Sequence, residues 1–222
     1  MITIHSISAK RNSLGKMLMD TRNKFWDKHA SSYAKRAISD IPSYEKKLAL
    51  SREYFSKDAT AIEVGCGTGS TALLHAPYLK HILATDISAA MLDIAERKRQ
   101  EQQIDNLSFQ QATVEELVVD EPVDIVFALN LIHLLEDKET AIATIKSWLK
   151  PGGVLISSTP CLGDRMKFFQ LIGPIGKALG LMPLVRVFTE QELLNSFQQQ
   201  GFSIDTKWRP EKALSVFLVA RT

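Results

Sequence analysis

Three alternate glycines follow a short, mostly apolar stretch in the first third of the chain. Gly65, Gly67 and Gly69 come directly after residues 61–64 and precede an apolar pattern with helical spacing. Glycine permits positive φ angles and lets a ligand approach the main chain where a Cβ atom would collide. A buried strand that ends in such a turn is typical of nucleotide-binding sites, so we expect a ligand on this backbone. The alternative is a tight strand-to-helix turn without a ligand.

A second apolar stretch, residues 81–86, ends in Asp86, seventeen residues beyond Gly69. In a doubly wound sheet the tip of the second strand lies beside the tip of the first, and a carboxylate there accepts hydrogen bonds from both ribose hydroxyls. The alternative is that Asp86 caps the next helix, a role that suits Ser88 equally well. The glycine turn and the acid together predict a nucleotide site more specifically than either feature alone.

Apolar patterns along the chain alternate between short buried strands and amphipathic helices, which is typical of a mostly parallel sheet. The last two strand-like stretches, 201–208 and 213–220, predict a hairpin, which requires one antiparallel strand. We therefore expect an α/β fold in a single domain of residues 1–222, a doubly wound, mostly parallel seven-stranded sheet with a C-terminal antiparallel hairpin. The other expected strands lie near 60–65, 81–86, 107–111, 123–128 and 153–159, and helical patterns cover 23–36 and 43–55.

These motifs resemble those of the class I S-adenosylmethionine-dependent methyltransferases that act on small molecules. Glu63 ahead of G-x-G-x-G is similar to the first motif of that family and unlike the G-x-G-x-x-G of nicotinamide enzymes. Residues 149–153, L-K-P-G-G, resemble the turn that the family places before its fifth strand. The resemblance implies a Rossmann-like methyltransferase fold, with S-adenosylmethionine as cofactor and S-adenosylhomocysteine as product. The alternatives are a non-catalytic protein that binds this cofactor and, less favoured, an NAD(P)-dependent oxidoreductase.

The resemblance also implies which residues bind the cofactor. Asp86 holds the ribose, the main chain of Val114 meets adenine, and Tyr33, in an aromatic stretch similar to one found in many small-molecule members, closes over the cofactor. The family usually has an acid at the position of Thr113, whose hydroxyl accepts hydrogen bonds with less electrostatic attraction. The expected cofactor-binding residues are Tyr33, Glu63, Gly65, Cys66, Gly67, Gly69, Asp86, Ile87, Met91, Thr113, Val114 and Ala128.

Two polar residues after the fourth expected strand are candidates for contact with the methyl acceptor. His133 is a candidate catalytic base, because the pKa of histidine lies near neutrality, and its alternative role is packing at the start of a helix. Asn130 is expected to touch the acceptor or the amino-acid end of the cofactor. Residues 128–131 read A-L-N-L rather than the N-P-P-Y or D-P-P-Y of nucleic-acid-methylating relatives. We therefore expect a small, partly apolar metabolite as substrate rather than nucleic acid.

Two segments outside the motif-bearing region are expected to cover the ligand. Residues 1–58 carry helical patterns that would cap the open end of the crevice. Residues 162–188 are strongly apolar but broken by glycine and proline, so they predict a lid over an apolar substrate. The alternatives for this segment are burial against the core and contact with a second subunit in a homodimer.

Composition and charge exclude several classes of protein. A chain of 222 residues with 45% apolar residues suits one domain with a sizeable core. No apolar run is long enough to cross a bilayer, no secretion signal is apparent, and two cysteines provide neither a disulfide framework nor a metal site. A cytoplasmic location is therefore expected. Residues 1–60 hold 12 Lys and Arg against 6 Asp and Glu, but these charges alternate with other residues and predict a solvated face.

Overall fold

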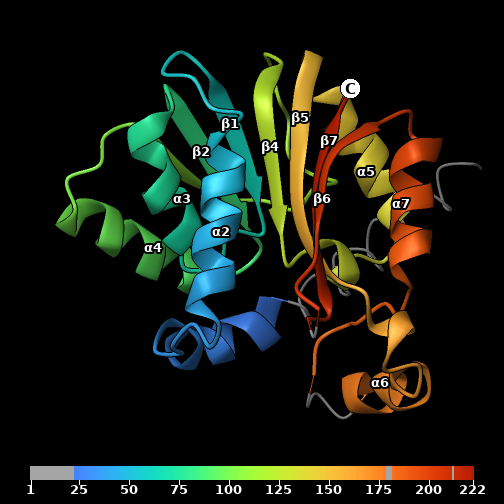
Figure 1. Ribbon diagram of the computed structural model, residues 1–222. Coiled ribbons are helices and arrows are strands. Elements are labelled where there is room, and N and C mark those ends of the chain that lie inside the picture. The colour runs from blue at the N-terminus through green and yellow to red at the C-terminus, as the bar shows by residue number, and fades with distance from the viewer. Residues whose placement is uncertain (1–22, 179–181, 212) are drawn as a thin grey trace, which may run out of the picture.

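Figure 1 shows the computed structural model of the protein, which describes residues 23–178, 182–211 and 213–222. Residues 1–22 of the expected N-terminal cap and residues 179–181 of the expected lid lie outside the described residues. Within the described part of the chain, no helix combines the length and the apolar character needed to span a bilayer.

A seven-stranded sheet forms the centre of the molecule (Figure 1). The strands are β1 (Thr60–Val64), β2 (His81–Asp86), β3 (Leu107–Gln111), β4 (Val123–Leu129), β5 (Leu149–Pro160), β6 (Ser203–Trp208) and β7 (Ser215–Arg221). Their order is β3-β2-β1-β4-β5-β7-β6. β1 pairs in parallel with β2 and β4, whereas β7 is antiparallel to both β5 and β6. The predicted mostly parallel sheet with a C-terminal antiparallel hairpin is confirmed.

Helices cover both faces of the sheet, and each face has its own apolar core. On one face Leu92 packs in a cluster with Phe127, and on the other Ile142 and Phe197 pack in a cluster with Val126. Figure 1 shows α6 (Phe169–Ala178) and the helical residues 23–34 beyond the carboxyl ends of the parallel strands. The remaining helices are α2 (Ile41–Arg52), α3 (Ser70–His75), α4 (Ala89–Glu101), α5 (Lys138–Ser147) and α7 (Glu190–Gln199), with short 3-10 helices η1 (Ala76–Tyr78), η2 (Ile132–Leu134) and η3 (Leu162–Asp164).

Side chains cap helices α4 and α7 and fix where they begin. The hydroxyl of Ser88 accepts a hydrogen bond from the amide of Met91 at 3.1 Å, so Ser88 is the N-cap of α4 and leaves Asp86 for another role. Thr189 and Glu192 form a reciprocal capping box at the start of α7. These caps satisfy amide groups that the first turn of a helix leaves without partners.

β5 begins earlier than its sequence predicts. Residues 149–153 were expected as a turn before a strand at 153–159, but Leu149 already pairs with Val123. The register then shifts, and regular pairing resumes between Val154 and Ile125. Gly152, with a φ of +77°, lies in this stretch, so the L-K-P-G-G segment is an irregular part of β5 rather than a turn before it.

The strand order reverses at β1, and this reversal positions the functional site. The chain moves from β1 to β2 and β3 on one side, then returns to β4 and β5 on the other. Where the order of a parallel sheet reverses, the connections leave the neighbouring strand tips in opposite directions and open a crevice at their carboxyl ends. The glycine turn after β1 and Asp86 at the end of β2 both lie at this edge.

Candidate cofactor site at the strand tips

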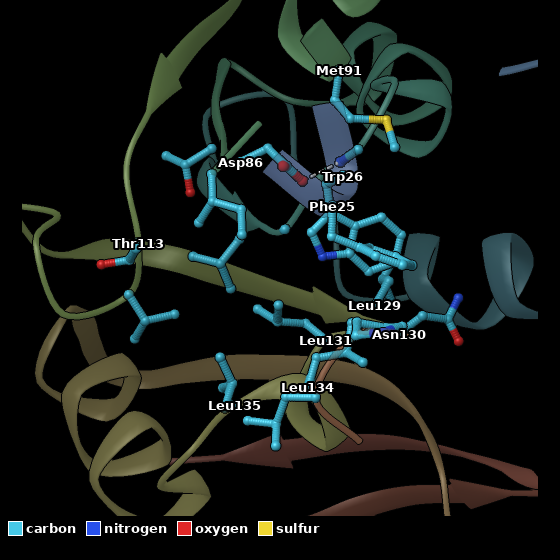
Figure 2. Close-up of a pocket in the computed structure, with 18 of the residues that line it drawn as sticks. Phe25, Trp26, Asp86, Met91, Thr113, Leu129, Asn130, Leu131, Leu134 and Leu135 are labelled. Carbon is cyan, nitrogen blue, oxygen red and sulfur yellow. Dashed lines mark hydrogen bonds between the residues drawn. The ribbon is translucent and has the colours of Figure 1, made fainter. Parts of the chain in front are cut away.

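A cavity of about 650 Å³ occupies the crevice at the carboxyl ends of β1, β2 and β4. In Figure 2, Thr113 lies on one side of the view and Asn130 on the other. The leucine side chains of the β4–α5 connection lie along one edge, and Phe25 and Trp26 lie opposite them. A cavity of this size, lined mainly by apolar side chains with a few polar groups, is typical of a small-molecule site.

The glycine turn presents main chain rather than side chains to this cavity. Gly65 and Gly67 line it, with φ angles of +68° and +54°. A Cβ atom on Gly67 would have only Cε1 of Tyr33 within 4 Å, at 3.7 Å, so it would project into the space that a ligand needs. Gly69, in contrast, does not line the cavity, and a Cβ atom there would lie 2.9 Å from Cβ of Ala95. Gly67 therefore faces open space for a ligand, whereas Gly65, where a Cβ atom would lie 2.8 Å from Cδ1 of Leu131, and Gly69 permit close packing of the turn.

Asp86 is held at the cavity wall by two main-chain amides. The amide of Gly67 donates to its Oδ2 at 2.8 Å, and the amide of Ser88 donates to its Oδ1 at 2.9 Å. Burial raises the pKa of this carboxyl group above its usual range, and the amide hydrogen bonds partly oppose that shift. Each carboxylate oxygen keeps a free lone pair after these contacts, so Asp86 can still accept from a pair of ligand hydroxyls.

Glu63 lies beneath the glycine turn as a second buried acid. Its side chain is 3% exposed, and Oε2 has no hydrogen-bond partner among the described residues. Burial, together with the nearby charge of Asp86, raises the pKa of Glu63 to about 8. An unpartnered buried carboxyl group beside a second acid favours a positively charged ligand, because a cation offsets the cost of ionising both groups. S-adenosylmethionine, which carries ammonium and sulfonium charges as well as a ribose, fits this arrangement.

The other end of the cavity is built from apolar side chains of separate segments. Phe25 and Trp26 come from the helical residues 23–34, Leu131 follows β4, and residues 182–184 come from the segment before α7. Asn130, at the tip of β4, is the polar residue of this end and has a left-handed φ of +56°. Left-handed conformations are uncommon for residues other than glycine and concentrate at functional sites.

Eight of the expected cofactor-binding residues meet at the cavity wall, and the others lie behind it. Glu63, Cys66, Gly69 and Ala128 do not line the cavity. The hydroxyl of Thr113 accepts from the amide of Glu116 at 3.2 Å and donates to its carboxylate at 3.3 Å, which leaves it one free lone pair. The expected residues that line the cavity are Tyr33, Gly65, Gly67, Asp86, Ile87, Met91, Thr113 and Val114.

His133 lies in η2 and is not part of the cavity wall. Its carbonyl oxygen accepts from the amide of Arg186 at 2.7 Å, and its Nδ1 is buried without a partner among the described residues. Burial lowers the pKa of His133 to about 4. The geometry therefore gives no support to a base role, which stays a prediction from the sequence.

Several cavity residues were not predicted from the sequence. Trp26 and Tyr33 are seven residues apart and so share one face of a helix, a signal that could have identified Trp26. Leu131, Leu134, Leu135 and residues 182–184 carry no comparable signal, because apolar residues at these positions are equally compatible with a core.

Comparisons with known proteins agree with this geometry. A family model described as "Methyltransferase domain" matches residues 62–157. Malonyl-[acyl-carrier protein] O-methyltransferase of Priestia megaterium is 29% identical over 166 residues, which cover 71% of this chain and 58% of that protein. Ubiquinone biosynthesis O-methyltransferase of Acinetobacter baylyi is 27% identical over 154 residues, which cover 68% of this chain and 63% of that protein. The crystal structure of YcgJ from Bacillus subtilis matches with a TM-score of 0.63 at 18% identity, over 80% of this chain and 96% of that one.

The chain thus spans about three fifths of the length of these two curated relatives. The matched residues, 62–157, contain the glycine turn, Asp86 and most of β5, and the solved structure shares the fold. Both curated relatives are methyltransferases by name. Motif, fold and relatives agree: residues 62–157 match the methyltransferase-domain family, and the chain resembles the class I S-adenosylmethionine-dependent methyltransferases.

Proposed function

We propose that the protein transfers a methyl group from S-adenosylmethionine to a small, partly apolar acceptor. The observation that carries this proposal is the two-ended cavity, in which glycine main chain and Asp86 form one end and apolar side chains form the other. The first end suits a charged nucleotide, and the second suits a smaller apolar molecule beside it. The names of both curated relatives support an oxygen atom as the methyl acceptor.

In this proposal the residues at the strand tips hold the cofactor. Asp86 accepts from the ribose hydroxyls, and the main chain at Gly65 and Gly67 lies against the amino-acid portion. Thr113, which lies on the side of the cavity away from Asn130 in Figure 2, and the adjacent Val114 meet the adenine ring, and Tyr33 covers the cofactor from the N-terminal helix. When bound, S-adenosylmethionine supplies a methyl group already activated by its sulfonium.

The remaining task of the chain is to orient the acceptor and exclude water. Phe25, Trp26 and the leucines after β4 supply apolar walls for both purposes. Orientation of two reactants can supply roughly 7–11 kcal/mol of the barrier, which exceeds the contribution of a single general base. The proposal therefore does not require His133. Residues 182–184 line the cavity, which supports a lid role for the end of segment 162–188.

Calorimetric titration of the purified protein tests the proposed function. We expect saturable binding of S-adenosylmethionine and S-adenosylhomocysteine and no binding of NAD⁺ or NADP⁺. Turnover is then measured by formation of S-adenosylhomocysteine in the presence of pooled small hydroxy and carboxylic acids. Binding of a nicotinamide dinucleotide would favour the oxidoreductase alternative. Cofactor binding without turnover for any acceptor class would favour a non-catalytic binding protein.

A further inference from the structure

Lys47 is a partly buried lysine whose ammonium group lies against the sheet. It belongs to α2, and its Nζ donates to Oγ of Ser158 at 2.9 Å. Among the described residues, no carboxylate lies within ion-pair distance of this ammonium group. Burial lowers the pKa of Lys47, and the more distant Asp40 opposes that shift only in part. Ser158 uses one of the three ammonium protons and leaves the other two unused by this contact.

The position of this ammonium group is next to the apolar end of the cavity. Ser158 is the pairing partner of Leu129 across β4 and β5, and its carbonyl oxygen accepts from the amide of Asn130 at 2.7 Å. Leu129 and Asn130 both line the cavity, and Figure 2 shows them at the side away from Thr113. Lys47 does not itself line the cavity, but it is hydrogen-bonded to the strand immediately behind this part of the wall.

Asn130 adds a second polar group at the same place. Its left-handed backbone places it at the cavity wall, and its side-chain amide makes no hydrogen bond to another described residue. A partly buried cation and an accessible amide thus flank an end of the cavity whose other side chains are apolar.

Lys98 and Lys146 are also partly buried, and neither has a carboxylate within ion-pair distance in the part of the chain that the structure describes. Each of them donates to a main-chain carbonyl oxygen, however, whereas Lys47 donates only to a hydroxyl group. The adjacent lysine of α2 differs from Lys47 in its exposure. Lys46 is exposed, and its Nζ lies 4.9 Å from the ring centroid of Trp208. Lys150 and Lys207, in turn, are paired with Asp124 and Glu190. Withdrawing a charge from water without an opposite charge costs free energy, so a partly buried ammonium beside a ligand cavity favours an anionic ligand.

We propose that Lys47 and Asn130 bind a carboxylate on the methyl acceptor, so that the substrate is an amphipathic acid with its apolar part between Trp26 and the leucines after β4. The proposal deepens the proposed function and rests on it. A single lysine matches the single negative charge of a carboxylate, whereas a doubly charged phosphate would call for a second cation. Lys47 lies behind the wall, and no lysine or arginine is found among the described residues that line the cavity.

Paired neutral and anionic probes test this inference. The protein saturated with S-adenosylhomocysteine is titrated with octanoate and phenylacetate, and each is compared with its neutral amide, octanamide or phenylacetamide. We expect at least one acid to bind at least tenfold more tightly than its amide. Lys47→Met should abolish this preference and leave amide binding within about twofold, because a buried charge-assisted contact is lost without loss of apolar surface. Asn130→Ala should weaken acid binding about threefold.

Lys46→Met is the matched control, since it removes the adjacent, exposed lysine of the same helix. It should leave the preference for the acid unchanged, and both lysine variants should bind S-adenosylhomocysteine like the parent. If Lys47→Met unfolds early in a thermal melt, Lys47→Gln replaces it. Equal binding of acids and amides, no saturable binding of either acid, or equal losses in both lysine variants would overturn the inference. Failure of the parent to bind S-adenosylhomocysteine would instead overturn the proposed function.

Discussion

The two ends of the cavity are built in different ways. At the β1–β2 end, main-chain amides and one carboxylate form the wall, and hydrogen bonds such as that from Gly67 to Asp86 fix their positions. At the β4 end, side chains from residues 23–34, the β4–α5 connection and residues 182–184 form the wall. A wall of main chain persists when side chains are substituted, whereas a wall of side chains changes with each substitution. The first end therefore suits a constant cofactor, and the second suits an acceptor that differs between related proteins. We call the β1–β2 end the constant end and the β4 end the variable end.

Gly69→Ala should have the largest effect and should act on the structure of the constant end. A left-handed φ costs a residue with a Cβ atom roughly 1–2 kcal/mol, and overpacking typically costs 1–3 kcal/mol more. The added Cβ would lie 2.9 Å from Cβ of Ala95 and 3.0 Å from Cζ of Phe109. We expect the free energy of unfolding, measured in urea, to fall by about 3 kcal/mol.

Gly152→Ala provides the control for this substitution. Gly152 has a similar φ of +77°, but a Cβ atom there would meet nothing within 4 Å. It should therefore lose only about 1–2 kcal/mol, the cost of the backbone conformation. Equal losses in the two variants would show that close packing of the glycine turn is not important.

Asp86→Ala should act on ligand binding at the same end. The substitution removes the proposed ribose acceptor and also the partner of two main-chain amides. We expect the affinity for S-adenosylhomocysteine, measured by calorimetry, to fall on the order of a hundredfold, as is common when charge-assisted hydrogen bonds are lost. The exposed Asp93 on α4 is the control, and Asp93→Ala should bind like the parent. A loss below threefold in Asp86→Ala would remove Asp86 from the binding site.

Acid should destabilise the packing behind the constant end through His75. This residue is 1% exposed, stacks on Phe127 with ring centroids 5.1 Å apart, and neither ring nitrogen has a partner among the described residues. Burial lowers the pKa of His75 from 6.5 to about 3. Because the unfolded chain then binds the proton more readily, the stabilisation is complete above pH 6.5 and is lost as the pH falls towards 3.

His75→Phe isolates this effect. Between pH 7.5 and pH 5 the parent should lose about 2 kcal/mol more of its free energy of unfolding than His75→Phe does. Urea denaturation at both pH values measures the difference. Parallel losses in the two proteins would mean that His75 is protonated, or hydrated, in the folded state.

Trp26→Leu should have the smallest effect on cofactor binding, because Trp26 belongs to the variable end. Its ring lines the cavity and meets Tyr33 edge-on, with centroids 6.4 Å apart. We expect the affinity for S-adenosylhomocysteine to stay within about threefold of the parent, because leucine preserves most of the apolar contact. A loss greater than tenfold would extend the cofactor site across the cavity and remove the distinction between the two ends.

The difference between a wall of main chain and a wall of side chains also explains which cavity residues the sequence predicts. The sequence predicts Gly65 and Asp86, both of which line the cavity, because a ligand on main chain requires specific residue types at a short, fixed spacing. Phe25 and Leu184 were not identified, since they meet only after the chain has folded, and their residue types also suit a core. The sequence does not predict the early start of β5, because L-K-P-G-G has the composition of a turn, whereas the pairing of Leu149 with Val123 depends on the neighbouring strand.

The buried acid beneath the glycine turn couples ligand binding to the release of a proton. With a pKa of about 8, Glu63 keeps its proton at neutral pH when no ligand is bound. Arrival of a cation stabilises the ionised form, so occupancy should release hydrogen ions into the buffer. The measured heat of binding would then vary with the ionisation enthalpy of the buffer. A ligand without a sulfonium charge would release fewer hydrogen ions, which would let this carboxyl group distinguish the methylated cofactor from its demethylated product.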